Sequence, residues 1–477
     1  MYRTSSLRPL DRRRFLTESA GGLGGIALAQ LLAHDGFGAD LPKPEFNGGL
    51  HHPAKVKRIV QLFMNGGASQ MDTFDYKPEL AKRHGEKVDF GIKVAVTSPI
   101  GNVMKSPFEF KQYGQSGRWV SSVFPHTAEC VDDLAFLMAM ASKTNVHGPA
   151  SYMQNTGFVT PGFPAVGAWV SYALGNLSDD LPAFVVLPDP RGLPYNNAGN
   201  FSAAFLPAAH QGVVIRPNDP IPIANLKPPS TASQITAAGE SAGLELLQSL
   251  NRDHLDSHPG DSRLEARIAS YELAAKMQVR APETFDLSGE SEATQKLYGL
   301  DDEATAPFGK NCLTARRMLQ RGVRFVQVWS GMSGASKNWD NHTDIPNELP
   351  FIAKSVDKPI AGLVRDLKQL GMFEDTLVVW TTEFGRMPFT QGETGRDHNG
   401  GTFVTWLAGA GVKAGASYGL SDEFSYQAID GKTYCYDLHA TILHLLGIDH
   451  TRLTYRHDGI DRRLTDVHGH VIQDVLA

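Results

Sequence analysis

The sequence contains little cysteine and no strongly basic region, and both shortages narrow its possible functions. Among the 477 residues there are three cysteines, Cys130, Cys312 and Cys435, which lie far apart. Cysteine zinc sites need closely spaced pairs, so a thiolate metal site is excluded and buried thiols are the simplest interpretation, with one disulfide still open. The formal net charge is −6 and no basic stripe is present, so we expect no nucleic-acid partner.

The sequence also lacks an apolar run long enough to span a bilayer. The apolar stretch over residues 21–33 is short and rich in glycine, and it follows the segment DRRRFL at residues 11–16. This order of elements is typical of a twin-arginine export signal. We therefore expect residues 1–39 to be such a signal, and the mature chain to reside in the periplasm or outside the cell with no transmembrane span. A basic tail beside a short helix is the alternative.

Short apolar runs alternate with helical patterns along the rest of the chain. The hydrophobic content is 42%, which suffices for one large α/β domain with insertions or for two domains. In residues 357–370 the apolar side chains form one helical stripe that Gly371 ends. The pattern predicts a doubly wound, mostly parallel sheet with helices on both faces, an α/β fold. The predicted strands cover residues 58–64, 134–140, 182–187, 323–329, 376–382 and 402–407.

We expect one domain over residues 50–477, interrupted by an insertion over about residues 217–300. That insertion begins with a proline-rich stretch at residues 217–229 and continues with helical patterns, including residues 262–277.

Polar residues gather next to the predicted strands, which is where ligands bind in open α/β sheets. Carboxylates and imidazoles together suit one or two divalent cations, with zinc favoured and calcium or manganese left open. Arg386 or Arg396 could pair with an anionic substrate. His147 could take part in catalysis, bind the metal or be structural, and Asp72 could instead cap a turn. The candidate metal ligands are Asp72, Asp340, His342, Glu383, Asp397 and His398.

Five segments in this order resemble a bacterial sulfatase-like family that is named as domain of unknown function 1501, within the alkaline phosphatase and sulfatase superfamily. The segments are GGASQMDTFD (66–75), WDNH (339–342), TEFGR (382–386), GRDH (395–398) and DLHATILHLLG (437–447). The likeness runs from about residue 50 to the C-terminus. It implies an alkaline phosphatase-like fold and a metal-dependent hydrolase of phosphate or sulfate esters, acting on a small molecule or a polysaccharide. It leaves the oligomeric state open.

By position, the resemblance makes Asp72, Asp340, His342, Glu383 and His398 look like metal ligands of the superfamily. The chain departs from the superfamily at two places. Phe384 stands where a metal-binding residue is usual, and His147 stands where the resemblance places a nucleophile. No sulfatase-type Cys-x-Pro-x-Arg segment occurs, so formylglycine cannot form. His147 and Arg386 are therefore the candidate catalytic residues. The alternative is a non-catalytic metal-binding or surface-associated protein that keeps the sulfatase-like fold.

Overall fold

The computed structural model describes residues 50–91, 99–178, 181–223, 237–258, 285–334 and 338–477, together with Leu264, Ile268 and Glu272. The predicted export signal, residues 1–39, lies outside the described residues, as does most of the helix predicted over 262–277. Residues His52–Ala477 form one compact unit by their contacts.

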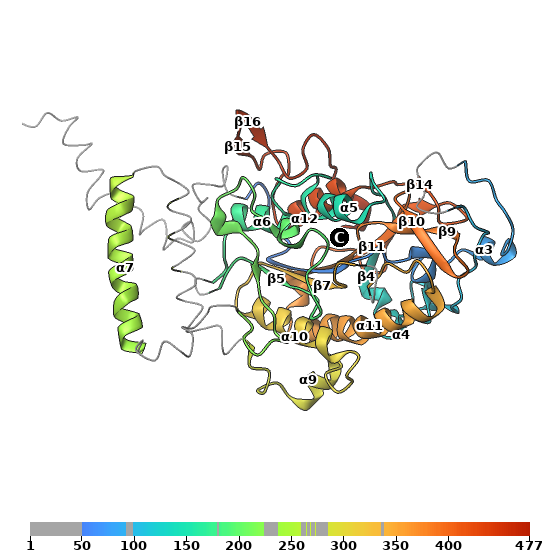
Figure 1. Cartoon of the computed structure of the whole chain (residues 1–477), viewed down its shortest axis with the longest axis horizontal. Coiled ribbons are helices and arrows are strands. Elements are labelled where there is room, and N and C mark those ends of the chain that lie inside the picture. The colour runs from blue at the N-terminus through green and yellow to red at the C-terminus, as the bar shows by residue number, and fades with distance from the viewer. Residues whose placement is uncertain are drawn as a thin grey trace, which may run out of the picture. The chain divides into compact units, whose positions relative to one another are not determined.

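An eight-stranded sheet runs through the centre of this unit (Figure 1), and its strands lie in the order β12-β4-β11-β8-β1-β7-β5-β6. Every pairing is parallel except those of β11, which is antiparallel to both β4 and β8. The mostly parallel α/β sheet is thus confirmed. Its strands are β1 (Arg58–Met64), β4 (Leu134–Met140), β5 (Phe184–Leu187), β6 (Val213–Val214), β7 (Phe325–Ser330), β8 (Thr376–Thr381), β11 (Phe403–Gly409) and β12 (Ser417–Tyr418).

All six strands predicted from apolar runs belong to this sheet. Every residue of β4 and of β8 is buried, which is the burial expected of strands covered on both faces. Continuous apolar runs form such strands because neither face meets water.

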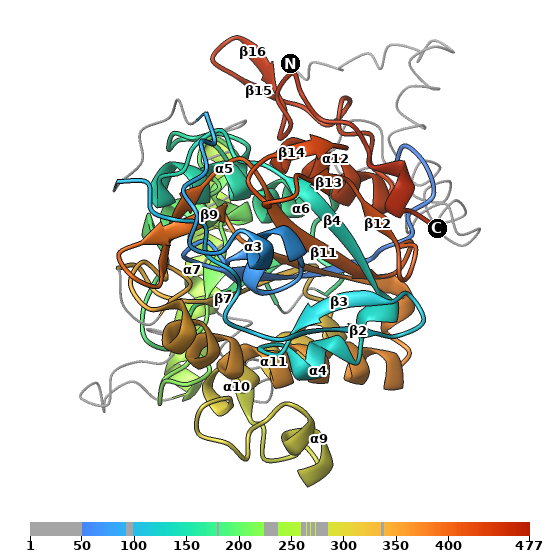
Figure 2. The ribbon, with the colours of Figure 1, turned by 90° about the vertical axis from the view of Figure 1, so that its right-hand side faces the viewer.

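Helices cover both faces of the sheet, as Figures 1 and 2 show. On one face α10 (Ala306–Gln320) packs against α11 (Ile345–Gln369), and on the other lie α5 (His147–Thr156), α6 (Val166–Leu174) and α12 (Cys435–Leu445). The helix predicted over residues 357–370 is the second half of α11. The first half was missed because Pro350 lies inside it, where proline normally argues against a helix.

Between β8 and β11 the chain forms a two-stranded antiparallel hairpin of β9 (Gly385–Gln391) and β10 (Gly395–Asn399). The other elements are short, except for the 21-residue helix α7. They are η1 (Gln70–Asp72), α3 (Pro78–Lys82), β2 (Phe110–Tyr113), β3 (Arg118–Ser121), α4 (Pro125–Ala128), η2 (Val131–Asp133), η3 (Asn197–Phe201), η4 (Ala208–His210), α7 (Ala237–Ser257), α9 (Glu292–Leu297), η5 (Phe373–Asp375), β13 (Leu420–Ser421), β14 (Ala428–Asp430), β15 (Tyr455–His457), β16 (Ile460–Arg462) and η6 (Gln473–Val475). Helices α7 and α9 fall within the predicted insertion.

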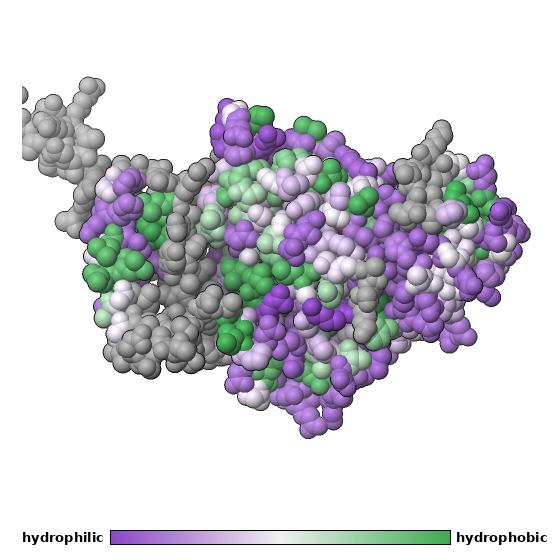
Figure 3. All heavy atoms as spheres, in the orientation of Figure 1, coloured by the Kyte–Doolittle hydropathy of each residue, from purple (hydrophilic) through white to green (hydrophobic). Residues whose placement is uncertain are grey.

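Hydrophilic residues cover most of the face shown in Figure 3, and apolar residues are scattered among them. Of the helices in the described ranges, none combines the length and the apolar character needed to cross a bilayer. The three cysteines are buried and free, so none of them forms a disulfide.

Candidate metal centre

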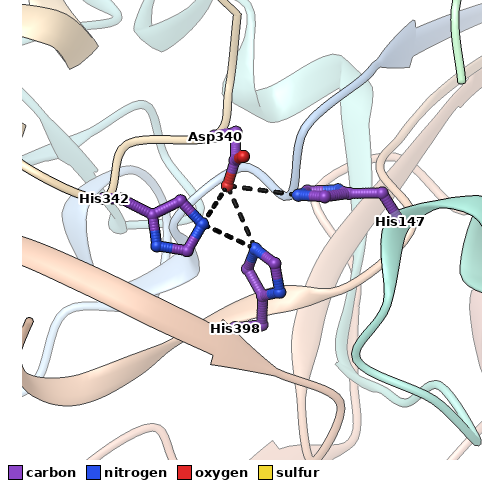
Figure 4. Close-up of side chains that lie close together, drawn as sticks. All are labelled: His147, Asp340, His342 and His398. Atoms are coloured by element: carbon purple, nitrogen blue, oxygen red, sulfur yellow. Dashed lines mark hydrogen bonds and ion pairs between the residues drawn. The ribbon is translucent and has the colours of Figure 1, made fainter. Parts of the chain in front are cut away.

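Four side chains converge at the carboxyl edge of the parallel strands (Figure 4). His147 is the first residue of α5, Asp340 and His342 lie between β7 and α11, and His398 lies on β10. One nitrogen or oxygen from each residue lies within 4.8 Å of the others. Three of the predicted metal ligands and the predicted catalytic histidine therefore meet at one point.

The contacts at this point are more numerous than hydrogen bonding alone explains. Asp340 Oδ1 lies 2.7 Å from His342 Nε2 and 3.1 Å from both His147 Nε2 and His398 Nε2. The Nε2 atoms of His342 and His398 are 2.8 Å apart. The Nε2 atom of His147 is buried without an aligned hydrogen bond. One carboxylate oxygen has two lone pairs, so it cannot accept hydrogen bonds from three imidazoles at once. A cation between the four atoms would bind the oxygen and all three nitrogens.

Each imidazole is oriented by an acceptor on its other nitrogen. His147 Nδ1 lies 2.7 Å from Glu383 Oε1, His398 Nδ1 lies 2.8 Å from the Asn145 carbonyl, and His342 Nδ1 contacts Gln391 Oε1. These oxygens only accept, so each Nδ1 carries the proton and each Nε2 presents a lone pair. This is the orientation that metal-binding histidines take from their surrounding partners.

The topology explains why residues so far apart in sequence meet here. Because β11 runs antiparallel to β8, the hairpin that precedes β11 lies at the same sheet edge as the ends of β1, β7 and β8. The loop after β1 packs closely on the Asp340 backbone. Gly66 has φ 126°, and a Cβ there would lie 2.6 Å from Asp340 N, so this approach requires glycine.

Arg386 lies behind the cluster and holds it in place. Its side chain is fully buried, and its Nη2 lies 2.6 Å from Asp340 Oδ1. Its Nε donates to the Gly67 carbonyl at 2.7 Å and its Nη1 to the Arg396 carbonyl at 3.2 Å. These contacts join Arg386 to Asp340 and to the surrounding backbone, whereas the sequence suggested that it could pair with a substrate anion.

The other predicted residues do not join the cluster. Asp72 forms a fully buried, two-pronged ion pair with Arg396, at 2.7 and 3.1 Å, and accepts from Ser69 Oγ at 2.5 Å. Asp397 Oδ1 accepts from the backbone N–H of His398 at 2.7 Å. Of the described contacts of Glu383, the one that reaches the cluster goes to His147 Nδ1.

The pKa shifts of Asp340 and His398 favour the forms of these side chains that bind a cation. Burial disfavours the charged form of Asp340, but the Arg386 charge and the three histidines outweigh it and hold the pKa of Asp340 far below its usual range. Burial lowers the pKa of His398 to about 4, so this ring is neutral at neutral pH. For His147, burial is outweighed by the carboxylates of Asp340 and Glu383, which raise its pKa. The raised pKa favours a second proton on the His147 ring, at Nε2. A cation bound at Nε2 would take the place of that proton.

Sequence reasoning missed the aromatic contacts of the cluster. The Tyr195 ring stacks on the His147 ring, with 4.5 Å between the ring centroids and an interplanar angle of 7°. The centroid of the Phe384 ring lies 4.8 Å from the centroids of both the His147 and the His398 rings. Tyr195 follows β5 in the chain, so the same rule that selected residues after strand ends could have found it.

A family model described as "Protein of unknown function (DUF1501)" matches residues 56–476, which is most of the chain. No curated protein matches the chain by sequence.

Several solved structures are distantly similar. The lipoteichoic acid synthase LtaP from Listeria monocytogenes is 11% identical, with 85% of this chain and 74% of that chain covered and a TM-score of 0.36. The PsFucS1 sulfatase from Pseudoalteromonas sp. is 12% identical, with coverages of 85% and 74% and a TM-score of 0.35. The alkaline phosphatase from the Antarctic bacterium TAB5 is 10% identical, with coverages of 82% and 98% and a TM-score of 0.33. At such low similarity, the chemistry of the site rests on its own residues.

Proposed function

The chain belongs to the DUF1501 family, and from this premise we propose that it is an exported, metal-dependent hydrolase of phosphate or sulfate esters. The observation that carries the proposal is the convergence of three Nε2 atoms and one carboxylate oxygen at the carboxyl edge of the sheet. Buried, polar groups that converge in this way at strand ends mark the reactive site of an α/β enzyme more often than its core.

The donor set supports zinc better than calcium or manganese. Three imidazole nitrogens and one carboxylate oxygen match the ligands of zinc, whereas calcium prefers oxygen ligands throughout. Ligand atoms of a tetrahedral zinc site are about 3.3 Å apart. Four of the six separations in the cluster are 2.7–3.1 Å and all six are within 4.8 Å, so the side chains would have to shift to reach that geometry. When bound, a divalent ion supplies Lewis-acid stabilisation of negative charge on the ester oxygens.

The chain's own residues hold the ion and control access to it. His342 has the most exposed side chain of the four, at 22%, while those of His147, Asp340 and His398 are 11% exposed or less. We infer that the substrate approaches from the His342 side. Arg386 keeps Asp340 in place and neutralises it, and the Tyr195 and Phe384 rings exclude water from around His147.

Export is a separate part of the proposal, and it rests on the arginine-containing N-terminal segment. Twin-arginine export carries folded proteins, which suits a chain that acquires its metal before it leaves the cytoplasm.

One observation favours a second candidate, a non-catalytic metal-binding or surface-associated protein. His147 adds a fourth protein ligand where the resemblance places a nucleophile. Catalytic zinc sites usually have three protein ligands and an open position, whereas structural sites have four. If catalysis occurs, the ion must accept a fifth ligand or release one of the four.

Turnover separates the two candidates. The purified chain, stripped with a chelator and reloaded with zinc, manganese or calcium, would be assayed with aryl phosphate and aryl sulfate esters. We expect metal-dependent turnover of at least one ester, and its loss in His398→Ala. An ion that binds without turnover of either ester, with any of the three metals, would favour the non-catalytic candidate and overturn the hydrolase.

A further inference from the structure

Glu383 is a buried carboxylate at the centre that does not reach the point where the four ligand atoms meet. Its side chain is fully buried. Its Oε1 lies 2.7 Å from His147 Nδ1 and accepts from the Gly66 backbone N–H at 2.8 Å. Its Oε2 lies 3.1 Å from Thr382 Oγ1. Both oxygens therefore have protein partners, and the contact with His147 is the shortest.

We propose that Glu383 is a positioning residue that fixes His147 as a metal ligand, so that the centre holds one ion and not two. This inference rests on the metal centre of the proposed function. It reassigns a residue that the sequence suggested as a ligand, and it excludes His147 from acting as a free nucleophile.

The first step of the argument concerns the cost of burying the carboxylate. An ionised carboxylate without partners is expensive to bury, and a charge-assisted hydrogen bond from an imidazole N–H offsets much of that cost. The same bond fixes the proton on Nδ1 and makes Nε2 a more basic ligand. Glu383 thus acts on the ion only through the His147 ring.

The second step compares the three histidines. His398 has a backbone carbonyl as its partner and His342 has the side-chain amide of Gln391, so both acceptors are neutral. Only His147 has a charged partner among these contacts. Loss of that charge should therefore affect the His147 ligand bond more than loss of either neutral acceptor would affect the other two bonds.

The third step concerns the number of ions. In the part of the chain that the structure describes, His147, Asp340, His342 and His398 make up the one group of potential metal ligands that converge. The ring of Phe384, the residue after Glu383, contacts the His147 and His398 rings and offers no donor atom to a second ion. Asp72, the other carboxylate that the sequence suggested, is held by Arg396. Among the residues that the structure describes, the surroundings of Glu383 therefore supply no second set of ligands.

Glu383→Gln tests the proposal, because it keeps the shape of the side chain and removes its charge. We would measure zinc affinity by chelator competition, ion stoichiometry by mass spectrometry, and the visible spectrum of the cobalt-loaded protein. We expect one ion per chain in both proteins, a 10- to 100-fold weaker zinc affinity in the variant, and an altered cobalt spectrum.

Glu290→Gln is the matched control. The Glu290 side chain is also largely buried, at 11% exposed, but it pairs with Arg316 and Arg317, and no described contact joins it to the metal centre. The same charge change there should leave zinc affinity and the cobalt spectrum unchanged. Glu383→Asp serves as a second variant if Glu383→Gln does not fold. It keeps the charge but is too short to hold His147 in the same place, so the affinity should again fall.

Three outcomes would overturn the inference. Unchanged affinity and an unchanged cobalt spectrum in Glu383→Gln would remove Glu383 from its positioning role. Two ions per chain in the wild type, with one lost in the variant, would make Glu383 a ligand. The absence of any ion from the wild type would overturn the proposed function as well, so failure of the inference alone is distinguishable from failure of both.

Discussion

At the residue scale, the arrangement of the site separates ligands from the groups that support them. Asp340 contacts three imidazoles and Arg386, while Glu383, Gln391 and the Asn145 carbonyl hold the imidazoles from behind. The supporting groups decide which nitrogen carries the proton and therefore whether the ring can bind an ion. Loss of a supporting residue should thus weaken metal binding without removing a ligand.

Arg386→Gln should destabilise the metal-free protein, because it leaves the buried Asp340 carboxylate without its cationic partner. Breaking a buried ion pair from one side costs about 3–5 kcal/mol of the free energy of unfolding. Saturating zinc should recover part of that loss, since the ion neutralises the same carboxylate. Urea unfolding with and without zinc would measure both effects.

Arg396→Gln is the control for this variant, because it breaks the equally buried pair with Asp72. We expect a comparable loss in the free energy of unfolding. Zinc should restore less of that loss in Arg396→Gln than in Arg386→Gln. Equal recovery in the two variants would show that Asp340 does not bind the ion.

The sequence identified the correct strand ends but not the roles of the individual residues there. Asp340, His342, His398 and His147 were all selected by their place beside predicted strands. The ion pair that occupies Asp72 could not be predicted, because Arg396 lies 324 residues away in the chain. Whether a carboxylate meets an ion, an arginine or an imidazole depends on contacts that sequence position alone does not specify.

At the element scale, strands were easier to predict than their directions. Continuous apolar runs identify buried strands, but they look the same in either direction, so the antiparallel pairing of β11 was not predicted. The β9–β10 hairpin was missed because its buried residues include Arg386, Arg396 and His398, which show no apolar alternation. The hairpin that carries His398 therefore gives no apolar signal in the sequence.

The contact between α12 and α5 should make stability depend on pH through His439. This ring is fully buried on α12, its Nε2 donates to the Gln154 carbonyl of α5 at 3.0 Å, and burial lowers its pKa to about 4. The unfolded chain binds a proton near pH 6.5 and the folded chain does not until about pH 4. Stability from this group is therefore complete above pH 6.5 and is lost as the pH falls toward 4, by about 3 kcal/mol in total.

His439→Gln should flatten this dependence. Urea unfolding of the metal-free protein at pH 7 and pH 5 would show a smaller loss of stability in the variant than in the wild type. His470→Gln, at a side chain that is 79% exposed, should leave the dependence unchanged. An equal pH dependence in wild type and His439→Gln would contradict the assignment.

At the scale of the whole molecule, the proposal joins an N-terminal export signal to a folded domain. Changing Arg12, Arg13 and Arg14 together to lysine preserves the charge and removes the paired arginines. We expect the precursor to remain in the cytoplasm, because twin-arginine signals are recognised by their arginines and not only by charge. Fractionation and immunoblotting would measure its location.

Arg8→Lys, an equally conservative change outside the motif, should be exported normally. Export of the triple variant at the wild-type level would contradict the twin-arginine assignment.

The central claim is that three histidines and one aspartate hold a single divalent ion. Its most direct test is the metal content of the purified chain after zinc loading and removal of excess metal, compared with His398→Ala. We predict one ion per chain in the wild type and a large loss of bound metal in the variant. A wild type without bound metal, or a variant that retains all of it, would contradict the claim.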